Sequence, residues 1–381
     1  MITWSDIITF RMKRQFLSSF VDRDHYDDLF LNMSPVPTTY WCEPGNPPSL
    51  PLHVDFDDYD YNSIRRSRRD ILKGRYGGGS IAYVTREDLE LFGCLYKKEL
   101  TEISSIQTEL LELLSEEGPM NIGLMKELTG LFVKDITPAL HKLQEAFLVY
   151  EDQLDNEGDR GWYLFESEFP EIDLKRYNKT EALKLAIPRF AKLIIFFDDT
   201  MLKSYYKLPI KLIKEAISEL LTENVLKVII LEGKRGYLLQ DEEQLLQDEI
   251  QLLQDEEQSL QDEEQLQQSN YKSLVDKDIK TTIPPVLLLQ RNDFLVRAYA
   301  DELKSAYHSE WDALYYLLID GEFHGVVVGR FKFGPHVIED IILDLAEEEK
   351  ENRREEIQQA VYCVFDRTDS PIKNYNGQKN N

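Results

Sequence analysis

The feature that most constrains the fold of this 381-residue chain is an order of elements that occurs twice along it. In residues 99–166, apolar side chains recur at the three- and four-residue spacing of amphipathic helices, and Gly118 ends the first of these segments. Two short runs of β-branched and aromatic residues follow, one on each side of the polar turn 155–160. The three segments with helical periodicity are 99–118, 121–130 and 133–149.

Residues 179–240 repeat this order. Two strands in 225–239 follow three segments that have helical periodicity. These segments are 179–197, 198–208 and 209–224. Three helices followed by a hairpin is the layout of a winged helix, so we predict one winged helix in 99–178 and another in 179–240.

The last quarter of the chain has a different pattern. Residues 281–345 are rich in β-branched and aromatic side chains, and Asp320-Gly321 is a strong hairpin signal between two apolar runs. We predict a β-barrel-like domain here, which makes the whole an α+β protein. For residues 346–381 we predict a charged helix followed by a disordered polar tail.

An acidic insert or linker is predicted at residues 241–280. The repeat in 238–265 is four copies of a seven-residue unit, which contain eleven carboxylates and no lysine or arginine. These account for eleven of the 26 excess negative charges and leave a net charge of −15. The leucines of each unit are adjacent and do not occupy split a and d positions, which favours a solvated helix or a disordered insert. The alternative is a coiled coil that binds a protein partner.

Composition excludes several classes of protein. The three cysteines, Cys42, Cys94 and Cys363, match no metal-ligand spacing, so we expect no metal and no cofactor. The sequence contains no signal segment and no run of about 18 apolar residues. We therefore expect a cytoplasmic monomer that does not associate with membranes.

A basic cluster precedes a glycine run. It contains Arg65, Arg66, Arg68, Arg69, Lys73 and Arg75, all of which except Arg68 are candidate DNA contacts. If this segment is helical, Arg65, Arg69 and Lys73 share one face, at a spacing that can follow a phosphate backbone. The alternative is a solvated face neutralised by the acidic residues upstream. The glycines at 77–79 lack the Lys-Ser or Lys-Thr of a phosphate-binding loop, so we predict a tight turn into a strand.

Two further groups are candidates for a site. Lys234 and Arg235 lie in the hairpin turn of the unit 179–240, and a wing at this place can contact phosphates. Asp55, Asp57 and Asp58, close to His53, could polarise a water molecule, although such runs are more often solvated loops. These three carboxylates are the catalytic candidates.

Several motifs together resemble a known family. Segment 287–307 contains Asp293 and is followed by Asp320-Gly321 and by a strand that ends in Gly329-Arg330. The N-terminal "FRMKRQFL" is similar to an Arg-x-x-Arg-Gln-x-Leu helix through Arg11, Arg14, Gln15 and Leu17. In this order the motifs resemble the bacterial winged-helix DNA glycosylases of the AlkZ and YcaQ group, which remove alkylated or crosslinked purines.

The resemblance implies three consecutive winged helices and a C-terminal β-barrel, so that residues 1–98 would hold a degenerate first unit. It also implies double-stranded DNA, including alkylated DNA, as the partner. The candidate DNA contacts that it adds are Arg11, Arg14 and Arg330. Gly78 and Ala82 stand where the family has an arginine and a histidine.

The largest departure from the family concerns catalysis. The family orients a water molecule with Gln-x-Gln, or Gln-hydrophobic-Asp, after the first helix, and this sequence has no glutamine between Gln15 and Gln107. The segment from Ser34 to Pro51 takes that place, so no catalytic residue is carried over. Three functions stay open: a DNA-binding protein without glycosylase activity, an active glycosylase whose water is held by one of the three candidate carboxylates, and an adaptor for protein partners.

Overall fold

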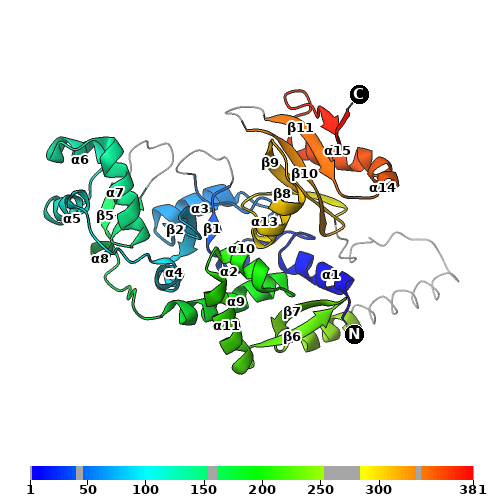
Figure 1. The fold of residues 1–381 in the computed structure, drawn as a ribbon, viewed down its shortest axis with the longest axis horizontal. Coiled ribbons are helices and arrows are strands. Elements are labelled where there is room, and N and C mark those ends of the chain that lie inside the picture. The colour runs from blue at the N-terminus through cyan, green and yellow to red at the C-terminus, as the bar shows by residue number, and fades with distance from the viewer. Residues whose placement is uncertain (1, 40–45, 153–160, 253–283, 332–335, 381) are drawn as a thin grey trace.

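The computed structural model describes residues 2–39, 46–152, 161–252, 284–331 and 336–380. Three groups of helices and hairpins are followed along the chain by a C-terminal sheet (Figure 1). The first and third groups lie at the centre of the molecule, the second at one end and the sheet at the other (Figure 1). The chain is therefore an α+β protein, as predicted.

The first group is three helices and a three-stranded sheet. Its helices are α1 (Trp4–Arg14), α2 (Tyr26–Met33) and α3 (Asp58–Ser67), and its strands are β1 (Val36–Pro37), β2 (Ile71–Tyr76) and β3 (Ser80–Thr85). The strand order is β1-β3-β2, with both pairings antiparallel. The Thr3 and Asp57 side chains accept backbone N–H groups and so begin α1 and α3. The short helix η1 (Arg86–Asp88) and α4 (Leu89–Tyr96) follow.

The basic cluster does not form one helical face. Helix α3 ends at Ser67, Arg69 has a left-handed backbone with a φ of 61°, and Lys73 lies on β2. The predicted turn at residues 77–79 is confirmed, since these glycines have φ values of 56°, 82° and 86°.

The second group has the predicted order of elements. These are α5 (Ser105–Glu117), α6 (Ile122–Thr129), α7 (Val133–Glu145), β4 (Val149–Asp152) and β5 (Gly161–Leu164). Trp162 is fully buried in a core that includes Leu110 and Leu140. Helix α8 (Phe165–Glu168) then leads to the third group. The turn predicted at residues 155–160 lies outside the described residues.

The third group also follows the predicted order. It consists of α9 (Lys179–Ile194), α10 (Asp199–Tyr206), α11 (Ile210–Thr222), β6 (Leu226–Leu231) and β7 (Lys234–Leu239). Helix α9 packs against α11 and also against α1, α2 and α4 of the first group. One apolar core therefore runs through both groups.

The beginning of the acidic repeat packs onto this body. Residues 242–252 are helical, and the buried Leu246 lies in one cluster with Ile7 and Phe10 of α1. The buried Glu242 carboxylate pairs with Arg14 at 2.6 Å. Residues 253–265 of the repeat lie outside the described residues, so the solvated or partner-binding character of that part stays a prediction.

The C-terminal sheet has six strands in the order β13-β12-β11-β10-β9-β8 and is open. Its strands are β8 (Val286–Gln290), β9 (Asp312–Ile319), β10 (Glu322–Arg330), β11 (Val337–Leu343), β12 (Asn374–Tyr375) and β13 (Gln378–Lys379). Helix α13 (Phe294–Ala306) connects β8 to β9, and α14 (Glu347–Asn352) and α15 (Arg354–Val364) follow β11. The predicted hairpin at Asp320-Gly321 is confirmed. The prediction of a C-terminal β-domain is confirmed as a mixed sheet, but the sheet does not close into a barrel.

The prediction of a disordered tail is wrong. Residues 374–379 form the hairpin of β12 and β13, and β12 adds to β11 in parallel. Tyr375 is buried, and its hydroxyl donates to the Lys350 carbonyl at 2.8 Å. Asn376 and Gly377 turn the chain with φ values of 51° and 78°, the conformation that two-residue hairpins require.

Candidate nucleic-acid interface

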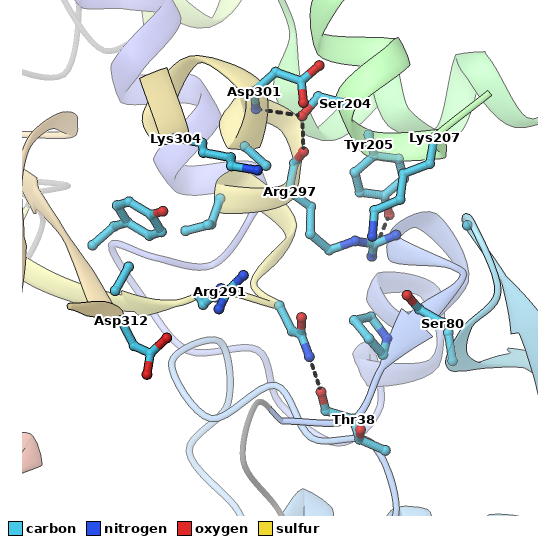
Figure 2. A pocket seen from close by; sticks show the side chains of 18 of the residues that line it. Thr38, Ser80, Ser204, Tyr205, Lys207, Arg291, Arg297, Asp301, Lys304 and Asp312 are labelled. Carbon is cyan, nitrogen blue, oxygen red and sulfur yellow. Dashed lines mark hydrogen bonds between the residues drawn. The ribbon is translucent and has the colours of Figure 1, made fainter. Parts of the chain in front are cut away.

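A cleft of about 790 Å³ lies where the first group, the third group and the C-terminal part meet (Figure 2). The first group supplies Pro35, Thr38, Tyr76, Gly77, Ser80 and Ala82. The end of α10 supplies Ser204, Tyr205 and Lys207. The segment from β8 to β9 supplies Arg291, Arg297, Lys304, Trp311 and Asp312. Segments that are far apart in the sequence therefore build the cleft together.

Four cations line this cleft although the chain has a net charge of −26. They are Lys207, Arg291, Arg297 and Lys304. Two carboxylates, Asp301 and Asp312, are also in the lining, and Asp301 pairs with Lys203 at 3.0 Å. The cleft is thus a positive patch on an acidic protein, which is the electrostatic character expected of a site for a polyanion.

Arg297 is fixed at the centre of the cleft by contacts on several sides. Its guanidinium lies 4.1 Å from the centre of the Tyr205 ring and donates to the Pro35 carbonyl at 2.8 Å. The Ser204 hydroxyl accepts from the Asp301 amide and donates to the Arg297 carbonyl at 2.9 Å, which joins α10 to α13. The charge of Arg297 is therefore held in place before any ligand binds.

Lys207 follows the last residue of α10 and has a left-handed backbone with a φ of 53°. Figure 2 shows that its side chain and that of Arg297 reach toward each other across the cleft. Partial burial of the ammonium, together with the positive charges of Arg297 and Arg291, lowers the pKa of Lys207, and Asp301 opposes this shift. A larger share of Lys207 is consequently neutral at physiological pH than for an ordinary surface lysine.

Aromatic side chains between the end of α13 and β9 also line the cleft. Trp311 lies in the lining with Tyr307 and Tyr316. The guanidinium of Arg330, at the end of β10, lies 4.5 Å from the centre of the Trp311 ring. Flat rings next to cations are a combination that nucleotide bases and phosphates can use together.

A buried histidine, His53, joins the first group to the start of α13. His53 Nε2 lies 2.9 Å from Asp293 Oδ2, and His53 Nδ1 lies 2.5 Å from the Gln15 carbonyl oxygen. Both partners only accept hydrogen bonds, so both ring nitrogens donate when the imidazole is protonated. Burial by itself lowers the pKa of His53, but the charge and hydrogen bond of Asp293 and the Gln15 carbonyl outweigh burial and raise the pKa above 6.5.

We predict a pH dependence of stability from this pair. Because the folded-state pKa of His53 is raised, its contribution is complete below pH 6.5 and is lost as the pH rises through the folded-state value. The melting temperature of the wild type should therefore fall more steeply between pH 6 and pH 9 than that of His53→Asn. His308→Asn, at an exposed histidine, is the control and should leave the slope unchanged. Parallel curves for wild type and His53→Asn would contradict the prediction.

The two N-terminal candidates for DNA contact, Arg11 and Arg14, interact with other residues of the protein. Arg11 is buried in α1, and its guanidinium donates to the Gly321 carbonyl at 2.6 Å and to the Tyr299 hydroxyl at 3.1 Å. Arg14 pairs with the buried Glu242. Both arginines therefore connect α1 to distant parts of the chain.

The residues of the basic cluster also make contacts within the protein. Arg65 and Arg66 are buried, and the Arg65 guanidinium lies 4.7 Å from the Phe30 ring centre. Arg69 pairs with Asp152 at 3.2 Å and also with Glu168 of the second group.

The strand residues of the cluster connect the first group to the second. Lys73 lies 3.2 Å from Glu151, and Arg75 Nε donates to Gln144 at 2.8 Å. The exposed members of the candidate set are Lys234, Arg235 and Arg330. For these three, contact with DNA stays a prediction.

The three candidate carboxylates lie outside the lining of the cleft. Asp58 is buried and accepts from the Tyr26 hydroxyl at 2.9 Å, the Ser49 hydroxyl at 2.6 Å and the Leu50 amide at 2.6 Å. Asp57 begins α3, and Asp55 is exposed. Among the described residues, no group of three or more His, Cys, Asp or Glu side chains could hold a metal ion.

The cations of the cleft were missed at the level of sequence, although a signal was present. Arg291 and Arg297 lie inside the segment 287–307 that carries the family resemblance. Lys304 lies in the same segment, whereas Lys207, directly after α10, has no local pattern that distinguishes it. Gly78 is beside the cleft, where a Cβ atom would lie 3.4 Å from the Lys207 Cδ, and Ala82 lines the cleft.

These elements define the class of fold: an α+β chain with winged-helix units and a C-terminal sheet. Its fold is AlkZ-like. The solved structure of the Streptomyces sahachiroi DNA glycosylase AlkZ is similar to this chain with a TM-score of 0.60 and 13% sequence identity, over 98% of this chain and 99% of that one. No protein-family model matches the sequence, and neither does any curated protein. Within the described residues, no helix is long and apolar enough to cross a membrane.

Proposed function

We propose that this protein binds double-stranded DNA in the basic cleft and acts in DNA repair. The observation that carries the proposal is the set of four cations on the cleft wall in an AlkZ-like fold. Phosphate oxygens are the groups on DNA that lysine and arginine bind most often, and such contacts position a duplex without reading its sequence. Lys234, Arg235 and Arg330 are proposed as additional phosphate contacts.

We propose in addition that the protein does not excise bases by the mechanism of the glycosylases it resembles. The segment from Ser34 to Pro51, which by the resemblance replaces the glutamine motif of the family, contributes Pro35, Pro37 and Thr38 to the cleft. The two prolines have no side-chain polar atom, and Thr38 has a neutral hydroxyl, so the described residues of this segment that line the cleft include no amide–carboxylate pair to orient and activate water.

The acidic composition determines how the binding should depend on salt. The rest of the surface repels DNA, so attraction is confined to the cleft and a few flanking cations. Each phosphate contact releases condensed counterions, and the logarithm of the association constant then falls linearly with the logarithm of the salt concentration. Binding should be measurable at low ionic strength and weak at physiological ionic strength.

Charge reversal in the cleft tests the proposal. In fluorescence anisotropy titrations at low salt, Arg291→Glu combined with Lys304→Glu should weaken duplex binding by about 100-fold or more and flatten the salt dependence. The control is the double variant Lys373→Glu, Lys379→Glu, which changes the net charge by the same amount. Lys373 directly precedes β12, and Lys379 is the last residue of β13. Equal losses in both double variants, or no binding of plain or alkylated duplex by the wild type, would reject the proposal.

A further inference from the structure

We propose that Lys207 is the nucleophile of an abasic-site lyase, which cleaves DNA on the 3′ side of a base-free deoxyribose held in the cleft. This inference rests on the proposed DNA binding and assigns a reaction to the same cleft. It requires an amine that is open to the ligand, partly neutral and close to cations that can hold the phosphates on each side of the abasic sugar.

The position of Lys207 meets the first requirement. Its side chain is exposed to the cleft at the end of α10, where the left-handed backbone at φ 53° directs the residue away from the helix. Its aliphatic part lies beside the turn of β2 and β3, since a Cβ at Gly78 would be 3.4 Å from Lys207 Cδ and 3.8 Å from its Cβ. The β2–β3 turn thus contacts the aliphatic part of the Lys207 side chain, and the amine points toward Arg297 (Figure 2).

The surroundings of Lys207 meet the second requirement. The charged groups that face it are Arg297, Arg291 and Asp301, so two positive charges act against one negative charge. Together with partial burial, this lowers the pKa of the amine. A lysine next to other cations is a recognised way to obtain a nucleophilic amine at neutral pH.

The fixed guanidinium of Arg297 meets the third requirement. It is held by Tyr205 and the Pro35 carbonyl, so it can bind a phosphate without first being ordered. Arg291 and Lys304 lie in the same lining and add two positive charges. These three cations would neutralise the phosphate that leaves in the reaction.

The reaction balances without an oxidant or a metal. The neutral Lys207 amine adds to C1′ of the ring-opened aldehyde, and loss of water gives an imine. Water or one of the cleft carboxylates, Asp301 or Asp312, removes a proton from C2′, and the electron pair expels the 3′ phosphate oxygen as the C3′–O bond breaks. Hydrolysis of the imine then consumes one water molecule, in place of the one lost when the imine formed, and frees Lys207 together with an unsaturated aldehyde on the 3′ end.

Borohydride trapping tests the proposal on the full-length protein. A duplex with one preformed abasic site is incubated with the protein and sodium borohydride, which reduces an imine to a stable covalent adduct. The wild type should give an adduct, and peptide mass spectrometry should locate it at Lys207. Lys207→Arg keeps the positive charge without a nucleophilic amine and should lose the adduct while it still binds the duplex.

The matched control is Lys203→Arg, at a lysine on α10 that pairs with Asp301. This variant should form the adduct to the same extent as the wild type. An adduct that persists in Lys207→Arg, or that maps to another lysine, overturns the proposal. Absence of an adduct in a wild type that binds the abasic duplex also overturns it and leaves the proposed DNA binding intact, whereas absence of binding rejects both.

Discussion

Replacement of Asp58 by alanine should lower the free energy of unfolding by about 3–4 kcal/mol, because it leaves buried donors without an acceptor. The carboxylate accepts hydrogen bonds from Tyr26, Ser49 and Leu50, and the Tyr26 hydroxyl in turn accepts from Asn62 at 2.5 Å. Urea denaturation followed by circular dichroism measures this change. The result would show that the carboxylate holds the first group together.

Asp55 provides the matched control for this prediction. It belongs to the same acidic run but is exposed, and Asp55→Ala should change the free energy of unfolding by less than about 0.5 kcal/mol. Equal stability of the two variants would contradict the role assigned to Asp58. If Asp58→Ala also kept its DNA binding when folded at low temperature, a role of this carboxylate at the nucleic acid would be excluded.

Removal of Glu151 should have an effect of similar size at another place in the fold. Glu151 is 1% exposed and pairs with Lys73, which is 8% exposed, and Gln144 Nε2 donates to its second oxygen at 3.3 Å. Loss of one partner from a buried ion pair leaves an uncompensated charge, which costs about 3–5 kcal/mol. Glu151→Ala should therefore lower the urea midpoint substantially and loosen the contact between the first and second groups.

Two further variants test whether the unpaired charge causes this loss of stability. The double variant Lys73→Met, Glu151→Leu removes both charges and should recover most of the stability, because an apolar pair fills the same space without a desolvation penalty. Glu171→Ala breaks a surface pair with Arg86 in which both side chains are about half exposed and should cost less than about 1 kcal/mol. A double variant as unstable as Glu151→Ala would indicate that packing, and not the unpaired lysine, causes the loss.

The candidate site could be predicted only in part because charge in a sequence does not reveal pairing. Arg65, Arg69 and Lys73 attract notice by their density, yet their partners Asp27, Asp152 and Glu151 lie in other segments of the chain. Conversely, Lys207 and Arg297 are ordinary single cations in the sequence and meet only because α10 packs against α13.

The family resemblance was more informative about the fold than about the site. It led to the expectation of a degenerate winged-helix-like unit in residues 1–98, which stays a prediction; the elements there are α1, α2, β1, α3 and the β2–β3 hairpin. Its motif residue Asp293 accepts from the Leu295 amide at the start of α13 and pairs with His53. This motif residue therefore helps to orient the helix that carries Arg297.

The sequence alone determined the order of helices and hairpins, because helical periodicity, capping side chains and turn glycines act over a few residues. For example, α5 begins after Ser104 and ends before Gly118, within the segment where the pattern predicts a helix. Only the tertiary structure decided that the tail 374–379 is a hairpin, since β12 needs β11 as a neighbour. It also decided which cations face a ligand, because burial and ion pairing depend on segments that the chain brings together only when it folds.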